Sequence, residues 1–419
     1  MKIAVIGAGI SGLGSAYLLA QKFEVHLFES ANRLGGHSHT VFASEEEKQI
    51  PIDTGFLVYN ELTYPHLTAF FKHLDVVTVA SDMSLSIQNK NKNLEWAGTN
   101  LNSVFGQRKN LFKPKFYLML REVLRFAKEA DQNIIDSQKN SWTLGELLKY
   151  RSYTDEFCED YILPTGAAIW STPEKGMLDY PAETFLNFFR NHRLLDVTNR
   201  PTWRTVKNGS IQYVQKIASK LPHIHLNKSI LKVLRTNGKI EVQTLGESFV
   251  FDRVVMATHA PLTAKILDGQ SSMEKKVLNS FRYEANHAFL HQDDDLMPKQ
   301  KRCWASWNVS ASGLAAMNQA SQVSLTYFIN LLQPLNTNKN YFVTLNPGET
   351  PKNVLRAIDY SHPQFDLKSI AAQKELHEIQ GKSGVYFAGA WTRYGFHEDG
   401  LLSAVKVAEM LNVGVPWKI

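Results

Sequence analysis

The first thirty-six residues constrain the fold of this chain more than any other stretch. Lys2 to Ile6 is a short apolar run rich in β-branched residues, which is typical of a buried parallel strand. It leads directly into Gly7-Ala8-Gly9-Ile10-Ser11-Gly12, which fits the spacing G-x-G-x-x-G. In this pattern Gly7 allows a tight turn and Gly9 lets the backbone approach a pyrophosphate. Gly12 lets the following helix pack closely on the strand.

A second strand, Glu24 to Phe28, ends at Glu29, twenty-two residues after Gly7. A carboxylate in this place is suited to accept hydrogen bonds from a ribose diol. The order of strand, glycine loop, helix, strand and acid is complete, so the sequence predicts a dinucleotide-binding unit. We expect Ile10, Ser11 and Ser30 to belong to the same site.

The segment Arg33-Leu34-Gly35-Gly36-His37 indicates which dinucleotide is bound. An arginine can pair with phosphate, and a glycine pair lets the backbone pass close to a ribityl chain. The segment resembles the R-x-G-G extension of flavoproteins of the amine oxidase and phytoene desaturase type. The alternative is a surface loop with an ordinary glycine turn. Its position after the acid favours FAD as the cofactor.

Size and composition exclude several classes of protein. With 419 residues, 44% of them hydrophobic, the chain can bury two sizeable cores. The net charge of +6 is mildly basic, but no dense block of Lys and Arg points to nucleic acid. Cys158 and Cys303 show no pairing pattern, and the histidine pairs near His37 and His223 lack further ligands at metal spacing, so we expect no metal site.

The same features bear on where the protein resides. No run of eighteen apolar residues predicts a transmembrane helix, and the unpaired cysteines favour a reducing compartment. Cleavage of a signal peptide would destroy the glycine loop. We therefore expect a cytoplasmic protein, either soluble or peripheral to the inner face of the membrane.

The pattern predicts an α/β fold in which a Rossmann-type, glutathione-reductase-like FAD-binding domain is combined with a discontinuous α+β substrate domain of the amine oxidase type. Composition changes near residue 80, and buried parallel strands return at 252–258 and 384–391. We assign residues 1–78, 205–262 and 381–419 to the FAD-binding domain, and residues 79–204 and 263–380 to the substrate domain.

Later segments are expected to add contacts to the cofactor. The D-x-G segment beginning at Asp53 resembles the stretch that passes close to the isoalloxazine ring in flavin amine oxidases. Strand 230–234 stands where such flavoproteins place a backbone contact to adenine, and the helix from residue 397 offers a second set of N–H groups. The residues concerned are Thr54, Gly55, Phe56, Val233, Thr258, Gly389, Asp399, Gly400 and Leu401.

The chain holds no second G-x-G-x-x-G for NAD(P)H, so we expect the reducing equivalents to come from the substrate, as a hydride passed to flavin N5. The best candidates for a catalytic acid or base are His397 and Glu398, just before the terminal helix. The alternative is that both only cap that helix or bond to backbone.

Residues 109–130 predict a long amphipathic helix in which lysines and arginines interleave with apolar residues. One hypothesis is a basic amphipathic face that rests on a membrane. The simpler interpretation, which we favour, is a helix packed on the core with a solvated basic face.

Several segments together resemble the N-terminal flavoprotein domain of plant cyclopropane fatty acid synthases and its free-standing bacterial relatives, within the flavin amine oxidase superfamily. They are 7–14, 53–60, 63–65, 81–84, 161–170, 188–195 and 394–401. The resemblance implies a bound FAD and a lipophilic substrate. Because the bacterial relatives are associated with lipid methyltransferases, it implies desaturation of a methylated phospholipid acyl chain. An apolar tunnel lined by Ile169, Trp170, Phe185 and Phe188 would favour an acyl or isoprenoid chain.

Two departures separate the chain from ordinary amine oxidases. Phe396-His397 stands where those enzymes place an aromatic residue facing the flavin, and no cysteine near the C-terminal motif can link to a flavin. Two alternatives stay open: a small-molecule oxidase of the amine oxidase type, and a non-catalytic FAD-binding partner of a lipid methyltransferase.

Overall fold

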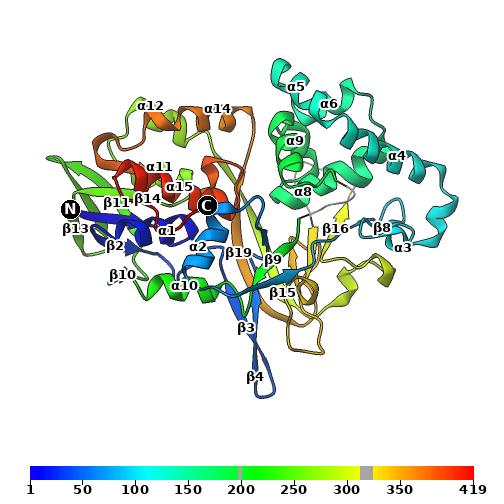
Figure 1. The fold of residues 1–419 in the computed structure, drawn as a ribbon, viewed down its shortest axis with the longest axis horizontal. Coiled ribbons are helices and arrows are strands. Elements are labelled where there is room, and N and C mark those ends of the chain that lie inside the picture. Colours follow the sequence, from blue (N-terminus) through cyan, green and yellow to red (C-terminus); the bar gives the residue numbers. More distant parts are fainter. Residues whose placement is uncertain (197–200, 312–323) are drawn as a thin grey trace.

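The computed structural model describes residues 1–196, 201–311 and 324–419. They form two domains that lie side by side, and both chain termini belong to the same domain (Figure 1). That domain contains the blue and red ends of the chain together with green segments, whereas the other is mainly cyan and yellow. The chain therefore passes between the domains several times.

The first domain is built on a five-stranded parallel sheet. In spatial order its strands are β10 (His223–His225), β2 (Glu24–Phe28), β1 (Lys2–Ile6), β14 (Arg253–Met256) and β20 (Val385–Phe387). In β1, Ile3 and Val5 belong to one hydrophobic cluster, and Ala4 and Ile6 belong to another. Since successive side chains of a strand point to opposite faces, the sheet is covered on both sides.

Helices cover one face, and a meander with further helices covers the other. The first cover consists of α1 (Ile10–Leu19), α2 (Pro65–His73), α10 (Ile211–Ala218) and α15 (His397–Met410). The second consists of β11 (Ile230–Thr236), β12 (Lys239–Thr244), β13 (Ser248–Phe251), α11 (Ala260–Ile266), α12 (Ser272–Leu278) and α14 (Leu367–Glu375).

All the parallel strands expected from the sequence lie in this one sheet, and β10 extends it beside β2. The predicted α/β fold class is therefore confirmed. The residue numbers assigned to the domain boundaries stay a prediction.

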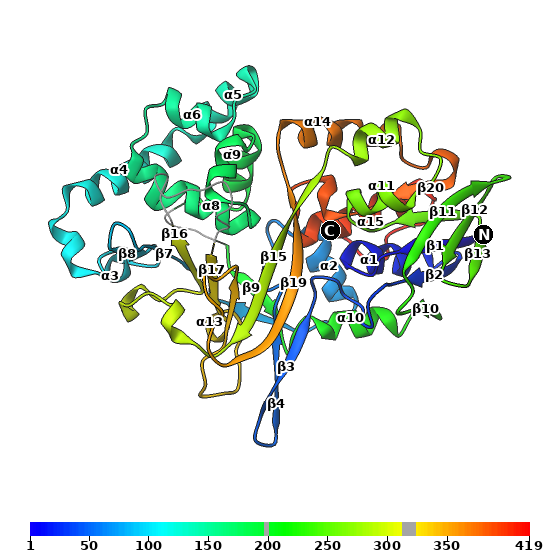
Figure 2. The same ribbon diagram turned by 180° about the vertical axis from the view of Figure 1, so that it is seen from behind.

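The second domain contains a seven-stranded mixed sheet. In spatial order its strands are β19 (Val354–Gln364), β15 (Arg282–His291), β18 (Phe342–Leu345), β17 (Ser324–Phe328), β16 (Trp307–Ala311), β7 (Leu85–Asn89) and β8 (Leu94–Ala97). Strands β15 and β19 are long and lie between the two domains (Figure 2). They therefore join the seven-stranded sheet of the second domain to the first domain.

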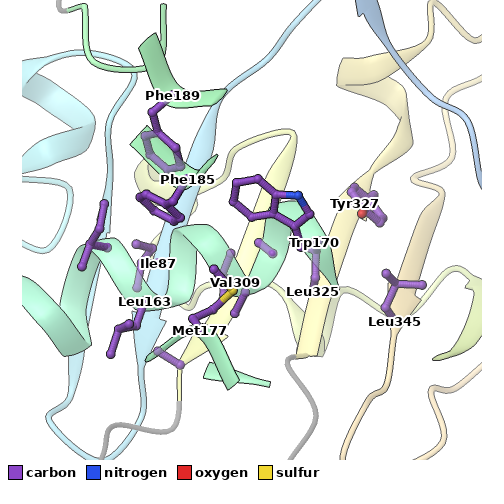
Figure 3. Packing of buried hydrophobic residues seen from close by; sticks show 14 of the residues in the cluster. Ile87, Leu163, Trp170, Met177, Phe185, Phe189, Val309, Leu325, Tyr327 and Leu345 are labelled. Atoms are coloured by element: carbon purple, nitrogen blue, oxygen red, sulfur yellow. The ribbon is translucent and has the colours of Figure 1, made fainter. Parts of the chain in front are cut away.

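Helices pack on this sheet and close the second core. They are α3 (Leu101–Val104), α4 (Pro114–Lys128), α5 (Ala130–Asn140), α6 (Leu144–Tyr150), α7 (Asp155–Phe157), α8 (Leu163–Trp170) and α9 (Ala182–Asn191). Figure 3 shows Trp170 and Phe185 from the helices beside Ile87, Val309 and Leu325 from the strands. One hydrophobic core thus joins helices and sheet.

Shorter elements complete the described structure. A hairpin of β3 (Thr40–Glu45) and β4 (Lys48–Asp53) projects from the body in both views (Figures 1 and 2). A small sheet contains β5 (Tyr59–Asn60), β9 (Trp203–Val206) and β6 (Thr78–Ser81). The short helix α13 spans Ile329–Leu332.

The basic helix expected at 109–130 is shorter than predicted. Residues Arg108–Phe112 form a separate 3₁₀ turn, η1, and α4 begins at Pro114. Proline favours the first position of a helix because it lacks the N–H that a helix interior needs. Among the described residues, no helix has both the length and the apolar character needed to cross a membrane.

Candidate functional site

The glycine loop joins β1 to α1 in a turn that needs glycine at two positions. The Gly7 N–H donates to the Phe28 carbonyl oxygen over 2.8 Å, and the φ angle of Gly7 is +97°. A Cβ atom on Gly12 would lie 1.7 Å from the Gly7 carbonyl oxygen. The helix therefore begins directly against the turn, and its first residues, Ile10 and Ser11, line a large cavity.

Gly9 has a different role, because a Cβ atom there would meet no other atom within 4 Å. Its φ of −72° and ψ of −175° are open to any residue. The space beside it belongs to the cavity. In a loop of this kind the pyrophosphate of a dinucleotide takes that space, so the residues present fit such a cofactor.

Glu29 follows β2 and lines the same cavity. Its Oε2 accepts a hydrogen bond from the Ala8 N–H, and its Oε1 accepts one from the Ala31 N–H, both over 2.9 Å. The Ser30 hydroxyl also donates to Oε1, over 3.2 Å. These bonds fix the carboxylate beside the glycine loop, where a ribose can reach it.

The segment from Arg33 to His37 packs on the glycine loop. The Gly35 N–H donates to the Ala8 carbonyl oxygen over 2.8 Å, and a Cβ atom on Gly36 would lie 3.0 Å from the Gly9 Cα. Gly36 and His37 line the cavity, whereas Arg33 and Gly35 lie behind that surface. The buried Nε2 of His37 finds no hydrogen-bond partner among the described residues, so it fits a bound polar group.

The predicted D-x-G segment lies along the backbone of His37. The Phe56 N–H donates to the His37 carbonyl oxygen over 2.8 Å, and a Cβ atom on Gly55 would lie 2.3 Å from that oxygen. Gly55 and Phe56 line the cavity. Thr54 is set behind it, where its hydroxyl bonds to the hydroxyl of Tyr360 over 2.8 Å.

His397 opens α15 and lies on the cavity wall. Its Nε2 is 2.8 Å from the Ser38 hydroxyl and 3.2 Å from the Tyr213 hydroxyl. Burial lowers the pKa of His397 to about 3, so the ring is neutral at neutral pH. Its contact with the cavity keeps His397 a candidate for catalysis, although a pKa this low makes its imidazole a weak base.

Glu398 points away from the cavity, so the structure gives the other catalytic candidate a structural role. Its two carboxylate oxygens accept hydrogen bonds from the His66 and Leu67 N–H groups, each over 2.9 Å. These groups belong to the first turn of α2. Burial raises the pKa of Glu398 to about 7. The sequence analysis left open that Glu398 only caps a helix or bonds to backbone. The structure shows such bonds, although the helix that Glu398 caps is α2 and not α15.

Asp399, Gly400 and Leu401 hold α15 in place and do not line the cavity. The Asp399 carboxylate accepts a bond from the Phe396 N–H over 3.0 Å, at the start of its own helix. A Cβ atom on Gly400 would lie 2.7 Å from the Ile10 side chain, so glycine lets α15 approach α1. The expected direct contact of these three residues with the cofactor stays a prediction.

Thr258 and Gly389 line the cavity just beyond the ends of β14 and β20, but Val233 does not. The Val233 side chain is fully buried in the core, and its carbonyl oxygen accepts a bond from the Asp268 N–H over 2.9 Å. Ile230, at the start of β11, reaches the cavity instead. The backbone contact of Val233 with the cofactor stays a prediction.

The cavity has a volume of about 730 Å³ and extends from the glycine loop into the second domain. Its far part, which we call the chamber, is mainly apolar and aromatic, and is lined by Met83, Leu85, Trp96, Tyr161, Thr165, Ile169, Phe188, Phe189, Leu194, Trp307 and Tyr327. Of the predicted tunnel residues, Ile169 and Phe188 line it, whereas Phe185 and Trp170 are buried core residues.

Sequence reasoning missed several cavity residues, including Lys228 and His362. Burial lowers the pKa of His259 and of His362 to about 4, so both rings are neutral. His362 lies on β19, in a stretch that carries no recognisable motif. Only the folded sheet brings it to the cavity.

A second histidine cluster lies outside the cavity. Donor atoms of Glu24, His26 and His223 come within 4.8 Å of one another. The sequence did not reveal this grouping, because parallel pairing of β10 with β2 sets His223 beside His26. The rings of these two histidines stack with their centroids 4.3 Å apart.

Comparisons with known proteins agree with this geometry. The profile of the family described as flavin containing amine oxidoreductase matches residues 10–282. The fold is similar to wild-type putrescine oxidase bound to putrescine, with a TM-score of 0.69, 13% identity, and 99% and 100% of the two chains covered.

Two further solved structures share the fold over 98% of this chain. Cyclohexylamine oxidase from Brevibacterium oxydans IH-35A has a TM-score of 0.66, 15% identity and 99% of its own chain covered. A CLA-producing fatty acid isomerase from P. acnes has a TM-score of 0.67, 12% identity and 97% of its own chain covered. At these identities the solved structures establish only the fold. The family profile establishes the membership: the chain belongs to the flavin containing amine oxidoreductase family and is an FAD-dependent oxidoreductase.

Proposed function

We propose that this enzyme removes a hydride from a lipophilic substrate and that it desaturates a methylated phospholipid acyl chain. The observation that carries the proposal is the single cavity in which the glycine loop and the apolar chamber meet. A substrate in the chamber would lie against the flavin end of the dinucleotide site. Both the resemblance to cyclopropane synthase flavoprotein domains and the chemistry of the chamber support a hydrocarbon substrate.

Charge in the cavity favours a neutral substrate over an alkylammonium ion. Among the described residues that line it, Glu29 is the only Asp or Glu, and Glu29 belongs to the dinucleotide site. The chamber instead offers side chains such as Leu85, Ile169 and Phe189. Burial of an unpaired ammonium group is unfavourable, whereas burial of an acyl chain gains about 0.8 kcal/mol for each CH₂ group.

Aromatic side chains stack beside the chamber at the start of α15. The Phe396 ring stacks on the Phe188 ring with centroids 4.7 Å apart, and Phe188 stacks on His192. Bound FAD supplies the two-electron acceptor. Desaturation also releases a proton from the neighbouring carbon to water, because with a pKa lowered to about 3 the His397 imidazole is only a weak base for it.

The fold neighbours support two substrate classes. The fatty acid isomerase has this fold, which supports a lipid substrate for the present chain. Putrescine oxidase and cyclohexylamine oxidase have it as well, and aromatic rings such as Phe188 and Phe396 beside the cavity suit an amine. A small-molecule amine oxidase is therefore the second candidate function.

The test is to add candidate substrates to the purified, FAD-loaded protein without oxygen and to monitor reduction of the flavin as a loss of its visible absorbance. We expect phospholipids with methylated acyl chains to bleach the flavin and to gain a double bond. Faster bleaching by putrescine or cyclohexylamine would overturn the lipid proposal. Bound FAD that neither class reduces, together with stable association with a lipid methyltransferase, would favour a non-catalytic partner.

A matched pair of variants tests the chamber itself. Leu194 lines the chamber, whereas its half-buried neighbour Leu195 packs on the core and does not reach the cavity. We expect Leu194→Lys to slow flavin reduction by lipid at least tenfold while FAD stays bound, because a charge then faces the acyl chain. In the control variant Leu195→Lys, lipid should reduce the flavin at the wild-type rate.

A further inference from the structure

One end of the second domain exposes large apolar side chains on consecutive elements. Phe112 is 85% exposed, Leu101 78%, Tyr117 46% and Leu111 41%. They belong to α3, η1 and the start of α4, and the Tyr117 hydroxyl donates to the Leu111 carbonyl oxygen over 3.1 Å. We call these four residues, together with the cations Arg108, Lys109 and Lys113, the η1–α4 surface. Grouped apolar exposure of this kind marks a contact site more often than scattered single residues do.

The same stretch is cationic. Residues 96–121 contain five Lys or Arg residues and no Asp or Glu. Arg108 donates to the Phe105 carbonyl oxygen over 2.8 Å, and Lys113 to the Asn93 carbonyl oxygen over 3.5 Å, so both cations bond there to neutral backbone. Lys115 differs, because it pairs with Glu156 over 2.6 Å.

Like charges in this stretch act on one another. Partial burial lowers the pKa of Lys113, and the neighbouring Lys109 lowers it further. An anionic surface brought against these residues would relieve that repulsion.

The two faces of α4 explain why its sequence left two interpretations open. Phe116, Met119 and Phe126 are buried, so the helix packs on the core as we favoured. Its outer side is not simply basic, because Tyr117, Arg121, Leu124 and Lys128 are all exposed and recur at helical spacing. Leu124 is 58% exposed. The outer stripe therefore alternates apolar and cationic groups.

The η1–α4 surface is placed at the end of the molecule farthest from the β11–β13 meander (Figures 1 and 2). A series of aromatic rings links it to the chamber. Trp96, which lines the chamber, lies 6.2 Å from the Phe116 ring, Phe116 lies 5.8 Å from Phe105, and Phe105 lies 5.8 Å from Tyr117. Packed aromatic side chains thus continue from the chamber wall to the exposed surface.

We propose that the η1–α4 surface docks on an anionic phospholipid bilayer. Phe112 and Leu101 would enter the boundary between head groups and acyl chains, while Arg108, Lys109 and Lys113 contact lipid phosphates. None of these residues lines the cavity, so docking does not depend on the proposed lipid oxidation. A nucleic acid or an acidic protein would match the cations but would leave Phe112 and Leu101 without apolar contacts.

Flotation of the full chain with vesicles tests the proposal. We expect the protein to float with vesicles that contain phosphatidylglycerol, to stay behind with pure phosphatidylcholine, and to be released by salt. Phe112→Ser should weaken partition about tenfold, and Lys109→Gln roughly fivefold. The controls Leu245→Ser, at an exposed position of the β12–β13 turn, and Lys220→Gln should float like the wild type.

A site-specific probe separates this surface from any other contact. Both natural cysteines are buried, and burial raises the pKa of their thiols, so an engineered surface cysteine is labelled selectively. A polarity-sensitive dye on Phe112→Cys should shift to the blue with anionic vesicles, and a dye on Leu245→Cys should not. Lack of flotation, equal shifts at both sites, or binding only to an acidic protein would overturn the proposal.

Discussion

The imidazole ring of His397 lies face to face with the ring of Phe56, with centroids 3.8 Å apart and 12° between the ring planes. The edge of the imidazole bonds to Ser38 and Tyr213, whose hydroxyls also bond to each other. His397 is thus held on one face by an apolar ring and on one nitrogen by neutral groups. Such surroundings favour the uncharged form and fix the orientation of the ring toward the cavity.

His397 should therefore stay neutral throughout the physiological range. With its pKa lowered to about 3 by burial, we expect its ring to show no titration between pH 5 and pH 9 in ¹⁵N NMR spectra of the protein. The signal is identified by its loss in His397→Gln. If that signal titrates near the ordinary value of 6.5, the enclosed environment described for His397 is wrong.

Glu398 is expected to contribute to stability and not to cofactor binding. Glu398→Ala removes both acceptors for the His66 and Leu67 N–H groups, so we expect a loss of about 1–2 kcal/mol in the free energy of unfolding, with normal FAD content. The exposed Glu47→Ala, in the β3–β4 turn, should change neither quantity. Loss of FAD from a folded Glu398→Ala protein would contradict this assignment.

The same variant has a predicted pH dependence. Burial raises the pKa of Glu398 from 4.5 to about 7, so between these values the folded chain keeps a proton that the unfolded chain has released. The stability that Glu398 contributes must then fall as pH rises through this window. We expect Glu398→Ala to lower the free energy of unfolding more at pH 5 than at pH 8, as measured by urea denaturation. A larger loss at pH 8 would refute the raised pKa.

Two glycines of one loop should fail in different ways. A Cβ atom on Gly12 would lie 1.7 Å from the Gly7 carbonyl oxygen, whereas a Cβ atom on Gly9 would meet nothing within 4 Å. We expect Gly12→Ala to lower the melting temperature by several degrees. Gly9→Ala should melt like the wild type without FAD but bind FAD at least tenfold more weakly, because the methyl group enters the cofactor space. Unchanged FAD affinity in Gly9→Ala would argue against that placement.

Sequence reasoning located the cofactor loops because local geometry dictates their residues. The open space at Gly9 and the carboxylate of Glu29 beside Ala8 both belong to one segment of about thirty residues. The chamber is different, since Trp96 and Tyr327 reach one cavity from strands far apart in the chain. Apolar periodicity marks such residues as buried, but it does not distinguish a core residue such as Phe185 from a cavity residue such as Phe188.

Adjacent residues posed the same difficulty at α15. His397 and Glu398 follow one another, yet one faces the cavity and the other bonds to α2. On a helix, neighbouring residues point about a quarter turn apart, so a motif alone leaves their directions open. Only the packing of α15 between α1 and α2 decides between them.

His291 provides a test of acid stability away from the cavity. It is fully buried, its Nδ1 accepts a bond from the Asp293 N–H over 3.0 Å, and its Nε2 lies 2.7 Å from the Thr344 hydroxyl. Burial lowers its pKa from 6.5 to about 4, so between these values the unfolded chain binds a proton that the folded chain does not.

Stability must therefore fall as pH decreases through that window, by at most about 3 kcal/mol from this one residue. His291→Asn cannot titrate, so we expect it to be less stable than the wild type at pH 7 and the gap in the free energy of unfolding to narrow by about 2 kcal/mol at pH 5. The exposed His287→Asn, on the same strand, serves as the control for loss of a histidine. A gap for His291→Asn that is constant with pH, measured by urea denaturation with FAD in excess, would show that His291 is not held neutral by burial.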